Sequence, residues 1–433
     1  MGVCCSIHLK ADKIHSNIQI IKGLSNTDFS CLPSKIYLDI HNHYSFIKIL
    51  GHGSIGTIRE AVRKHHTDSD EKFAIKSMPK KSVSSTCILK SELQILLSSD
   101  HPNLIKLFEA YEDSEYIHLV MEHCNGNSLL QALSGIVLTE QQALPIMYQI
   151  FSAISYLHKI QFVHRDLKLN NFIITGSDKW TQIKVIDFGL SSKFVDNKKL
   201  DFALGTPFYM APEILNNEYG KECDVWSLGI CLFKILSGSF PFCGNGIDEI
   251  FKSILYANVK FKHDVWEGVS GGCKDLIKKM LVKDSKNRIW MDGVLEHPVF
   301  DALKQINLAK IRLSSVENIF SYEFPDKISR CIMAVIIKHL VSQVPIQITE
   351  SFQALDLKHS GSVYLQDIIL AVQPYYSLEH IEKLKTNLEN INNKIKIKLN
   401  YSEFIFAAMN SKDLLTEKVL KAVYHHLTNV ISN

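Results

Sequence analysis

Two short segments of the chain carry residue types whose spacing fits phosphate chemistry. They are His164-Arg165-Asp166-Leu167-Lys168-Leu169-Asn170-Asn171 and, a short stretch later, Asp187-Phe188-Gly189. In this order the Asp166 carboxylate can accept the proton of an incoming hydroxyl group, and Lys168 can neutralise charge on a phosphoryl group in transfer. Asn171 and Asp187 supply the hard oxygen ligands that magnesium prefers. The segments therefore predict a centre that moves a phosphoryl group, with Asn171 and Asp187 as its magnesium ligands.

A glycine-rich segment lies upstream of this centre, directly after an apolar run. It reads Gly51-His52-Gly53-Ser54-Ile55-Gly56-Thr57-Ile58, and Phe73-Ala74-Ile75-Lys76 follows on a β-rich segment. Glycines allow a backbone to lie close over phosphates. The glycine pattern alone fits a flexible hairpin equally well, but a lysine at this distance favours a phosphate-anchoring role for Lys76.

Together these motifs resemble a protein kinase, over residues 44–300. The resemblance implies an α+β, bilobal fold in which a small β-rich lobe covers a larger helical lobe and ATP binds in the cleft. It pairs Lys76 with Glu92, places Met121 behind the adenine as the gatekeeper, and makes Glu122 to Cys124 the hinge whose backbone recognises the adenine edge. The residues that it assigns to ATP binding are Gly51, Gly53, Gly56, Ile58, Ala74, Lys76, Glu92, Met121, Glu122 and Cys124.

The same resemblance implies the kind of acceptor and a set of supporting contacts. Lys168 and Gly205-Thr206-Pro207 are typical of kinases that phosphorylate serine or threonine of protein substrates. The contacts implied are those of Glu213 with Arg288, of Asp224 with the backbone of the catalytic loop, and of Thr206 with Asp166 and Lys168.

Two departures from the family pattern bear on substrates and control. Ser128 and Asn170 stand where many arginine-directed kinases carry glutamates, which predicts a weaker demand for arginine near the phosphorylated residue. Asp201 stands where many relatives carry a phosphorylated threonine that the catalytic-loop Arg165 would clasp. We therefore expect Asp201 to substitute for the phosphate, and activation not to depend on phosphorylation of this segment.

Length, charge and cysteine content limit the classes of protein to which the chain can belong. At 433 residues the chain exceeds the size of one hydrophobic core, so two or three domains are expected. A formal net charge of +3 is too near balance to predict a nucleic-acid partner. The ten cysteines show no paired CxxC spacing, which favours reduced thiols in an intracellular protein. We expect no membrane-spanning helix, because no long uninterrupted apolar stretch is present.

The amino terminus fits the acceptor pattern for N-myristoylation. Gly2 would take the acyl chain after removal of Met1, and Cys4 and Cys5 are candidates for palmitoylation. A second acyl chain is needed because one myristoyl chain binds membranes only marginally. We expect residues 1–43 to form a flexible, acylated extension, the alternative being an unmodified disordered leader. Acylation would place the protein on the cytoplasmic face of the plasma membrane or of internal membranes, with a fraction free in the cytoplasm.

The residues after position 300 are too apolar to form a simple tail. Phe352-Gln353-Ala354-Leu355-Asp356 resembles the start of an EF-hand, and Tyr401-Ser402-Glu403-Phe404-Ile405-Phe406-Ala407-Ala408-Met409 resembles the end of another. A kinase followed by a junction and EF-hands is similar to the calcium-dependent protein kinases of plants and protists. The resemblance implies a junction at 301–348 that blocks the cleft until calcium binds. It also implies an all-α, EF-hand-like domain at 349–433, with the start of a third hand at Leu414 to Leu427.

The two candidate calcium loops keep only some of the required positions. A working loop needs oxygen ligands at its first, third, fifth, ninth and twelfth positions and a glycine at the sixth. In the first loop Asp356, Ser360 and Asp367 are the candidate calcium ligands and Gly361 fits the turn, but Lys358 puts a cation at the third position. The second loop keeps a glutamate at its last position and has lost most earlier ligands, as its residues Asn392, Lys394, Lys396, Ile397 and Glu403 show.

The sequence therefore predicts an acylated serine/threonine protein kinase of the calcium-dependent type that uses ATP and Mg²⁺ and whose response to Ca²⁺ is weakened or lost. The C-terminal module would regulate the kinase within the same chain. One alternative is a fully calcium-gated kinase completed by another subunit or by further hands. The other is a membrane-anchored, non-catalytic scaffold, against which the intact Lys76, Asp166 and Asp187 argue.

Overall fold

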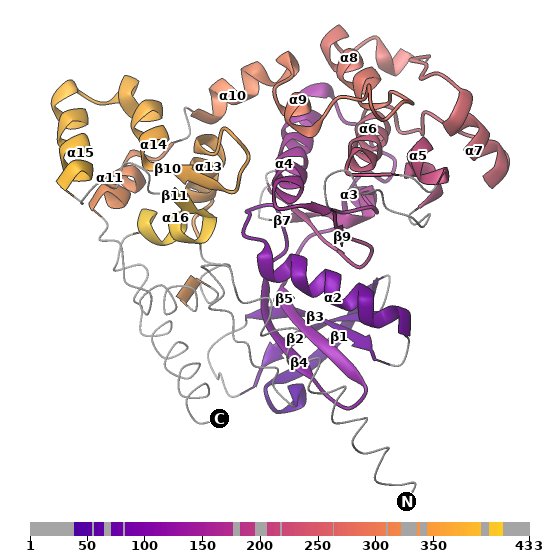
Figure 1. Ribbon diagram of the computed structural model, residues 1–433, viewed down its shortest axis with the longest axis horizontal. Helices are drawn as coiled ribbons and strands as arrows, with labels where there is room; N and C mark the ends of the chain where they lie inside the picture. The colour runs from indigo at the N-terminus through magenta and orange to yellow at the C-terminus, as the bar shows by residue number, and fades with distance from the viewer. Residues whose placement is uncertain are drawn as a thin grey trace, which may run out of the picture.

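The computed structural model describes residues 39–53, 56–64, 71–80, 83–175, 182–194, 206–216, 219–262, 264–308, 311–321, 336–337, 344–390 and 398–409. Figure 1 shows a β-rich lobe at one end, a helical lobe beyond it, and a separate helical module at the side of the helical lobe. The predicted lobes of a bilobal fold are thus present. No described helix is both long enough and apolar enough to cross a membrane.

The small lobe is a five-stranded antiparallel sheet with the order β1-β2-β3-β5-β4. Continuous burial along the middle of β3 and β5 reflects strands that are covered on both faces. The sequence predicts strands in the apolar runs Leu104 to Tyr111 and Tyr116 to Glu122; the first overlaps β4 and the second coincides with β5. Its elements are β1 (Tyr44–Gly53), β2 (Gly56–Arg63), β3 (Lys72–Pro79), α2 (Val83–Ser98), β4 (Leu107–Glu112) and β5 (Tyr116–Glu122).

The lobe begins earlier than the sequence indicated. A short 3-10 turn, η1 (Ile40–Asn42), precedes β1, and Ile40 is only 1% exposed. Ile40 packs in the same apolar cluster as Tyr44, Phe73 and Val120. The flexible extension predicted for 1–43 is therefore wrong for its last residues, because an apolar side chain there completes the core of the sheet.

The large lobe is organised around α6 (Glu222–Ser237), whose residues are almost all buried. Gly229 lets this helix approach the end of α8, since a Cβ there would lie 2.9 Å from a methyl carbon of Leu281. The other elements are α3 (Leu129–Ala132), α4 (Glu140–Lys159), β6 (Phe162–Val163), η2 (Leu169–Asn171), β7 (Phe172–Thr175), β8 (Gln182–Val185), β9 (Ser192–Lys193), η3 (Pro207–Tyr209), α5 (Pro212–Leu215), α7 (Ile247–Tyr256), η4 (Asp264–Trp266), α8 (Gly271–Met280), α9 (Met291–Leu295) and η5 (Pro298–Phe300).

The C-terminal module contains two helix–loop–helix units, joined where β10 pairs antiparallel with β11. Its own core, which includes Phe352 and Phe404, is distinct from the core of the kinase lobes. The described elements after position 300 are α10 (Asp301–Leu308), α11 (Leu313–Ser321), α13 (Ile346–Leu355), β10 (Ser362–Tyr364), α14 (Leu365–Val372), η7 (Gln373–Tyr375), α15 (Leu378–Asn390), β11 (Lys398–Asn400) and α16 (Tyr401–Ala408).

The described part of the junction packs with this module. Val316, Ile319 and Phe320 of α11 belong to the module's core, and α11 contacts α16. This segment of the region expected to block the cleft therefore has its apolar face covered elsewhere.

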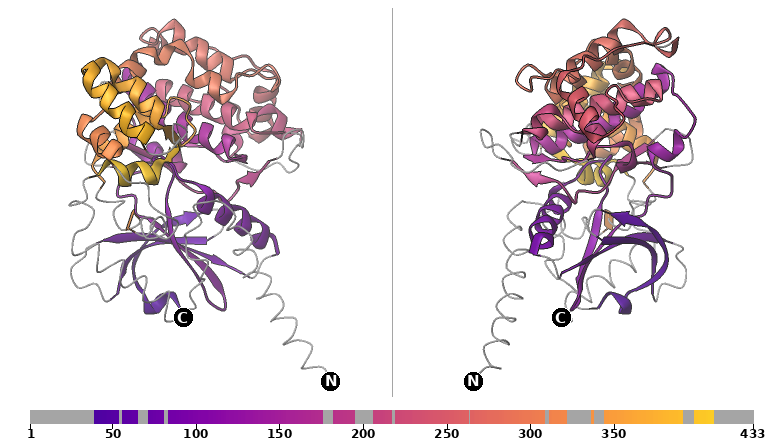
Figure 2. Two further views of the ribbon diagram at one scale, coloured as in Figure 1. Left: turned by 60° about the vertical axis from the view of Figure 1, so that its left-hand side comes forward. Right: turned by 90° about the vertical axis from the view of Figure 1, so that its right-hand side faces the viewer.

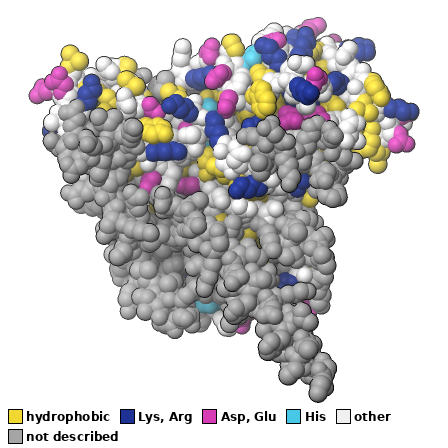
Figure 3. Space-filling view, viewed as in Figure 1, with side chains coloured by type: hydrophobic (Ala, Val, Ile, Leu, Met, Phe, Trp, Pro, Cys, Tyr) yellow, Lys and Arg dark blue, Asp and Glu magenta, His cyan; other side chains and the backbone are white. Residues whose placement is uncertain are grey.

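The surface of the large lobe carries both signs of charge. On the face in Figure 3, Lys and Arg side chains are interspersed with Asp and Glu over the described residues. This distribution agrees with the nearly balanced net charge of +3.

Candidate active site

The Lys76 ammonium joins the two lobes. It donates to Glu92 Oε1 of α2 at 2.6 Å and to Asp187 Oδ1 at 3.0 Å. Lys76 and Glu92 are each only 1% exposed. Burial alone would raise the pKa of Asp187, but the nearby Lys76 charge overrides it and lowers that pKa, so Asp187 is ionised. The sequence-predicted pair of Lys76 with Glu92 is thus in place and includes Asp187.

Asp187 and Arg165 have left-handed backbone conformations, with φ of 62° and 69°. Such conformations are uncommon for residues other than glycine and concentrate at functional sites.

The glycine-rich segment is the β1–β2 hairpin above this ion cluster. A Cβ on Gly53 would lie 3.2 Å from Lys76 Cε, so the backbone there runs directly over the lysine. Gly56 has φ of +136°, and a Cβ there would lie 2.4 Å from the Ser77 carbonyl oxygen, which only glycine permits. In the sheet register Ile58 lies opposite both Gly51 and Lys76, and Ala74 lies opposite the buried Met121.

The catalytic-loop residues form a compact hydrogen-bonded group. Lys168 donates to Asp166 Oδ2 at 2.6 Å and to Thr206 Oγ1 at 3.2 Å. Thr206 Oγ1 in turn donates to Asp166 Oδ1 at 3.1 Å, and Asn171 Nδ2 donates to the Asp166 carbonyl at 2.8 Å. The predicted contacts of Thr206 are confirmed, and Asp166, Lys168 and Asn171 lie together.

The buried carboxylate of Asp224 fixes the backbone of the catalytic loop. Asp224 accepts hydrogen bonds from the backbone N–H groups of His164 and Arg165, both at 2.9 Å, as predicted. Sequence reasoning missed His158, which shares a 2.9 Å hydrogen bond with Asp224. Burial would raise the pKa of Asp224, but the hydrogen bond and charge of His158 lower it. The available signal was a histidine in the last turn of an apolar helix just before the catalytic loop.

The predicted pair of Glu213 and Arg288 is also confirmed. The guanidinium donates to both carboxylate oxygens, at 2.5 and 2.8 Å, and its side chain is fully buried. This bidentate geometry ties α5 to the segment before α9.

The hinge residues differ in what their side chains do. Glu122 pairs with Lys184 at 2.8 Å and lines a pocket shared with the C-terminal module, so an adenine contact from Glu122 would come from its backbone. Burial, with a smaller contribution from Glu122, raises the pKa of the Cys124 thiol to about 12. Cys124 is therefore a neutral hinge residue.

Two of the three candidate calcium ligands, Asp356 and Ser360, are in contact. Asp356 accepts hydrogen bonds from the Ser360 and Gly361 N–H groups, at 2.9 and 2.8 Å, while Asp367 lies on α14. Lys358 Nζ is 5.6 Å from the centre of the Tyr364 ring. Among the described residues, no group of three or more His, Cys, Asp or Glu side chains is arranged to hold a metal ion.

Several predicted positions lie outside the described residues. They are Gly2, Cys4, Cys5, Asp201, Asn392, Lys394, Lys396, Ile397 and the segment 414–427.

This arrangement of a phosphate-anchoring lysine, its glutamate and two catalytic aspartates is that of a protein kinase cleft. A family model described as protein kinase domain matches residues 44–300. The chain is 33% identical to calcium-dependent protein kinase 5 of Plasmodium falciparum (isolate 3D7), over 83% of this chain and 64% of that relative. It is 30% identical to calcium-dependent protein kinase 7 of Arabidopsis thaliana, over 96% of this chain and 78% of the relative.

The chain belongs to the calcium-dependent protein kinase family and carries the domain of a serine/threonine protein kinase.

Proposed function

We propose that this protein transfers the γ-phosphate of ATP to serine or threonine residues of other proteins. The observation that carries the proposal is the joined set of contacts through Lys76, Glu92 and Asp187, beside the group formed by Asp166, Lys168 and Thr206. These contacts hold the phosphate-anchoring lysine, a metal-binding aspartate and the general base in the relative positions that phosphoryl transfer uses.

The residues present fit magnesium and ATP. Asn171 and Asp187 would hold the metal, since the Asn171 amide nitrogen is committed to the Asp166 carbonyl and Asp187 is ionised beside Lys76. Bound magnesium and ATP supply charge neutralisation and the transferred group. Asp166 then accepts the proton of the acceptor hydroxyl, while Lys168 and Thr206 fix the orientation of its carboxylate.

Catalysis is tested on the purified full chain. It should transfer phosphate from ATP to a serine-containing protein, and Asp187→Ala should remove that activity while circular dichroism stays unchanged. Absence of transfer by the unmodified chain, together with full function of Asp187→Ala in cells, would instead support the non-catalytic scaffold.

We also propose a relaxed demand for arginine in the acceptor. The Ser128 hydroxyl is engaged with Gln131 in the first turn of α3, and Asn170 is exposed and uncharged. Neither can form the ion pair that a carboxylate would offer to an arginine. A peptide array should show little enrichment of arginine, and strong, exclusive arginine selection would refute this point.

The helix–loop–helix units support the proposal of an EF-hand-like domain at 349–433, after a junction at 301–348, with weakened calcium control. The third and ninth positions of the first loop, where an ion needs oxygen ligands, hold the Lys358 ammonium and the Tyr364 ring. Calorimetric titration of the full chain with calcium should give no binding in the micromolar range. Micromolar binding and a large stimulation of activity would favour the fully calcium-gated alternative.

The N-terminal motif supports a membrane-bound, acylated protein. Gly2, with Cys4 and Cys5 as palmitoylation candidates, would anchor it to the cytoplasmic face of membranes. Metabolic labelling with an alkynyl myristate should mark the chain and not its Gly2→Ala variant; equal labelling of both would exclude Gly2 as the acceptor.

A further inference from the structure

The C-terminal module makes direct polar contacts with the kinase. On the kinase side they come from α4 and from the segment 99–106 between α2 and β4. On the module side they come from α13, from α16 and from the loop 356–361 between α13 and β10. The views in Figure 2 show the module against the helical lobe.

A buried chain of hydrogen bonds crosses this interface. His101 Nε2 is 3.3 Å from Ser152 Oγ, Ser152 Oγ is 2.9 Å from His359 Nδ1, and His359 Nε2 is 3.2 Å from Tyr148 Oη. His359 is the fourth residue of the loop and only 7% exposed. It is thus inserted between two kinase side chains of the same helix.

A backbone N–H group fixes which atom donates in each of these hydrogen bonds. The Asn103 N–H donates to His101 Nδ1 at 3.1 Å, so the His101 ring proton is on Nε2 and is donated to Ser152. Ser152 can then donate to His359 Nδ1, and His359 Nε2–H can donate to Tyr148. Both histidines are neutral in this arrangement and every member has a partner.

The loop backbone is fitted to the kinase as closely as its side chain. A Cβ on Gly361, whose φ is +69°, would lie 2.4 Å from Cε2 of Tyr156. The Tyr156 ring is held in turn, since its hydroxyl accepts the Asp100 N–H at 2.9 Å. Lys159 donates to the Lys358 carbonyl. Position 361 therefore requires glycine both for the close contact with Tyr156 and for the positive φ of the turn.

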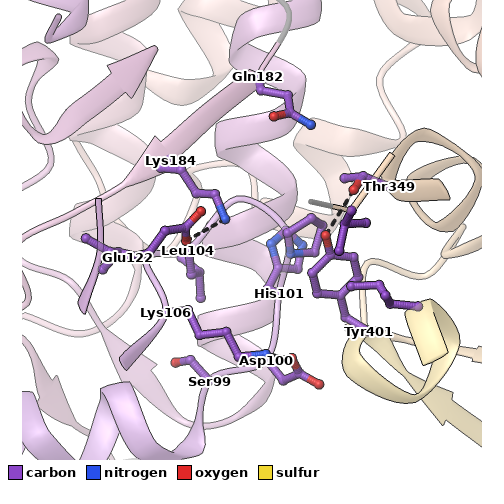
Figure 4. Close-up of a pocket in the computed structure, with 14 residues that line it drawn as sticks. Ser99, Asp100, His101, Leu104, Lys106, Glu122, Gln182, Lys184, Thr349 and Tyr401 are labelled. Atoms are coloured by element: carbon purple, nitrogen blue, oxygen red, sulfur yellow. Dashed lines mark hydrogen bonds and ion pairs between the residues drawn. The ribbon is translucent and has the colours of Figure 1, made fainter. Parts of the chain in front are cut away.

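A second group of contacts lies at the start of α16. Ser402 donates its N–H and its hydroxyl to the Asp100 carboxylate at 2.9 and 2.7 Å, and Lys106 donates to the Ser402 hydroxyl. Gln353 of α13 donates to Asn103 at 2.8 Å. Figure 4 shows the pocket in this region, with Lys184 and Glu122 on the kinase side and Thr349 and Tyr401 on the module side.

We propose that the loop Asp356–Gly361 is a docking loop that holds the C-terminal module on α4 of the kinase without a calcium ion. His359 is its anchor. The proposal rests on the proposed loss of calcium control and says what the loop does instead.

None of these contacts needs an ion. In an EF-hand loop the ligands come from positions one, three, five, seven, nine and twelve, so the fourth position, occupied by His359, is available for docking. Lys358 at the third position brings a positive charge that opposes calcium. The donors and acceptors of the interface are present with or without calcium.

The test is hydrogen exchange of the full chain with calcium and with a chelator. The unmodified protein should protect the amides of 99–106 equally in both. In the double variant His359→Ala/Ser402→Ala the amides of 99–106 should exchange at least about tenfold faster in both conditions, because several buried hydrogen bonds are lost. The matched control is Ser377→Ala with His380→Ala, an exposed and hydrogen-bonded serine and histidine at the start of α15, which should leave 99–106 unchanged.

Exchange within α16 reports whether the module itself remains folded in each variant. If the double variant unfolds the module, Gly361→Ala gives a second way to separate the surfaces, through its clash with Tyr156. The proposal would be overturned if chelation removed the protection of residues 99–106 in the unmodified protein. It would also be overturned if the double variant and Gly361→Ala both stayed folded and left the exchange of residues 99–106 unchanged. Because the readout is exchange and not phosphorylation, an inactive kinase would refute the proposed activity and leave this result interpretable.

Discussion

The buried Lys76 ammonium is stabilised by carboxylates from separate parts of the fold. Glu92 comes from α2 of the small lobe and Asp187 from the large lobe, at 2.6 and 3.0 Å. An unpaired charge at such a buried position costs several kcal/mol. The position of α2 relative to Asp187 is therefore set by electrostatics as well as by packing.

At the same scale, Asp166→Asn should lower kcat by about 10²–10⁴-fold, the usual contribution of a positioned general base. The amide keeps the shape of the side chain. Its single oxygen can accept from Lys168 and its NH2 group can donate to the Thr206 hydroxyl oxygen, so the loop should keep its conformation. Steady-state kinetics checks this, with Asp248→Asn on the exposed face of α7 as the control. A fall of less than about tenfold would contradict the role of Asp166.

Residue-level contacts were predictable where motifs are local. Asp166, Lys168 and Asn171 lie within one loop, and a known motif spacing fixes their relations to Thr206 and Asp224. The side chain of Glu122 was not predictable in the same way, because its partner Lys184 is distant in the sequence and on another strand. His359 was missed for a similar reason, because no local sequence pattern indicates that Ser152 and Tyr148 are its hydrogen-bond partners.

At the element scale, the contact between Glu213 and Arg288 connects α5 with the segment before α9. Arg288→Ala should reduce the free energy of unfolding by about 3–5 kcal/mol, because it leaves the Glu213 carboxylate unpaired in a buried site. Denaturant titration monitored by tryptophan fluorescence measures the change. The control is Lys279→Ala, which removes a half-exposed i,i+4 pair with Asp275 and should cost about 0.5 kcal/mol or less. Equal costs for the two variants would contradict this account.

Elements were predictable to the extent that their burial follows a local pattern. The apolar runs of β4 and β5 indicate their strands, whereas Ile40 lies outside any sustained pattern and its burial depends on the sheet it covers. The position of α11 likewise depends on long-range packing. Its apolar residues Val316, Ile319 and Phe320 fit any complementary surface, and only the tertiary structure assigns them to the module.

At the scale of the whole molecule, the hydrophobic core of the C-terminal module is separate from the cores of the kinase, and polar contacts join the two parts. The kinase core and the module core share no residue, and the described contacts between them include the hydrogen bonds of His359, Ser402 and Gln353. Docking therefore depends on the protonation state of its donors and acceptors more than an apolar interface would.

This dependence predicts that the module dissociates from the kinase in acid. Burial lowers the pKa of His359 from 6.5 to about 3, with the Lys159 charge acting in the same direction, Asp292 opposing it and Lys304 adding to it. Burial likewise lowers the pKa of the neighbouring His101 well below its usual value. A histidine whose pKa is lowered on docking binds more protons when undocked, so docking is stable above about pH 6.5 and weakens as the pH falls from there toward 3. The loss from His359 alone reaches about tenfold per pH unit.

Limited proteolysis of the full chain at pH 7.5 and 5.5, with a protease active at both, should show faster cleavage between kinase and module at the lower pH. His359→Gln should reduce that difference, because the amide can hydrogen-bond but does not titrate in this range. Cleavage at the same rate at both pH values would show that the histidine chain does not hold the interface. His380→Gln is the control, since His380 is exposed on α15 and hydrogen-bonds with Ser377 of the same module.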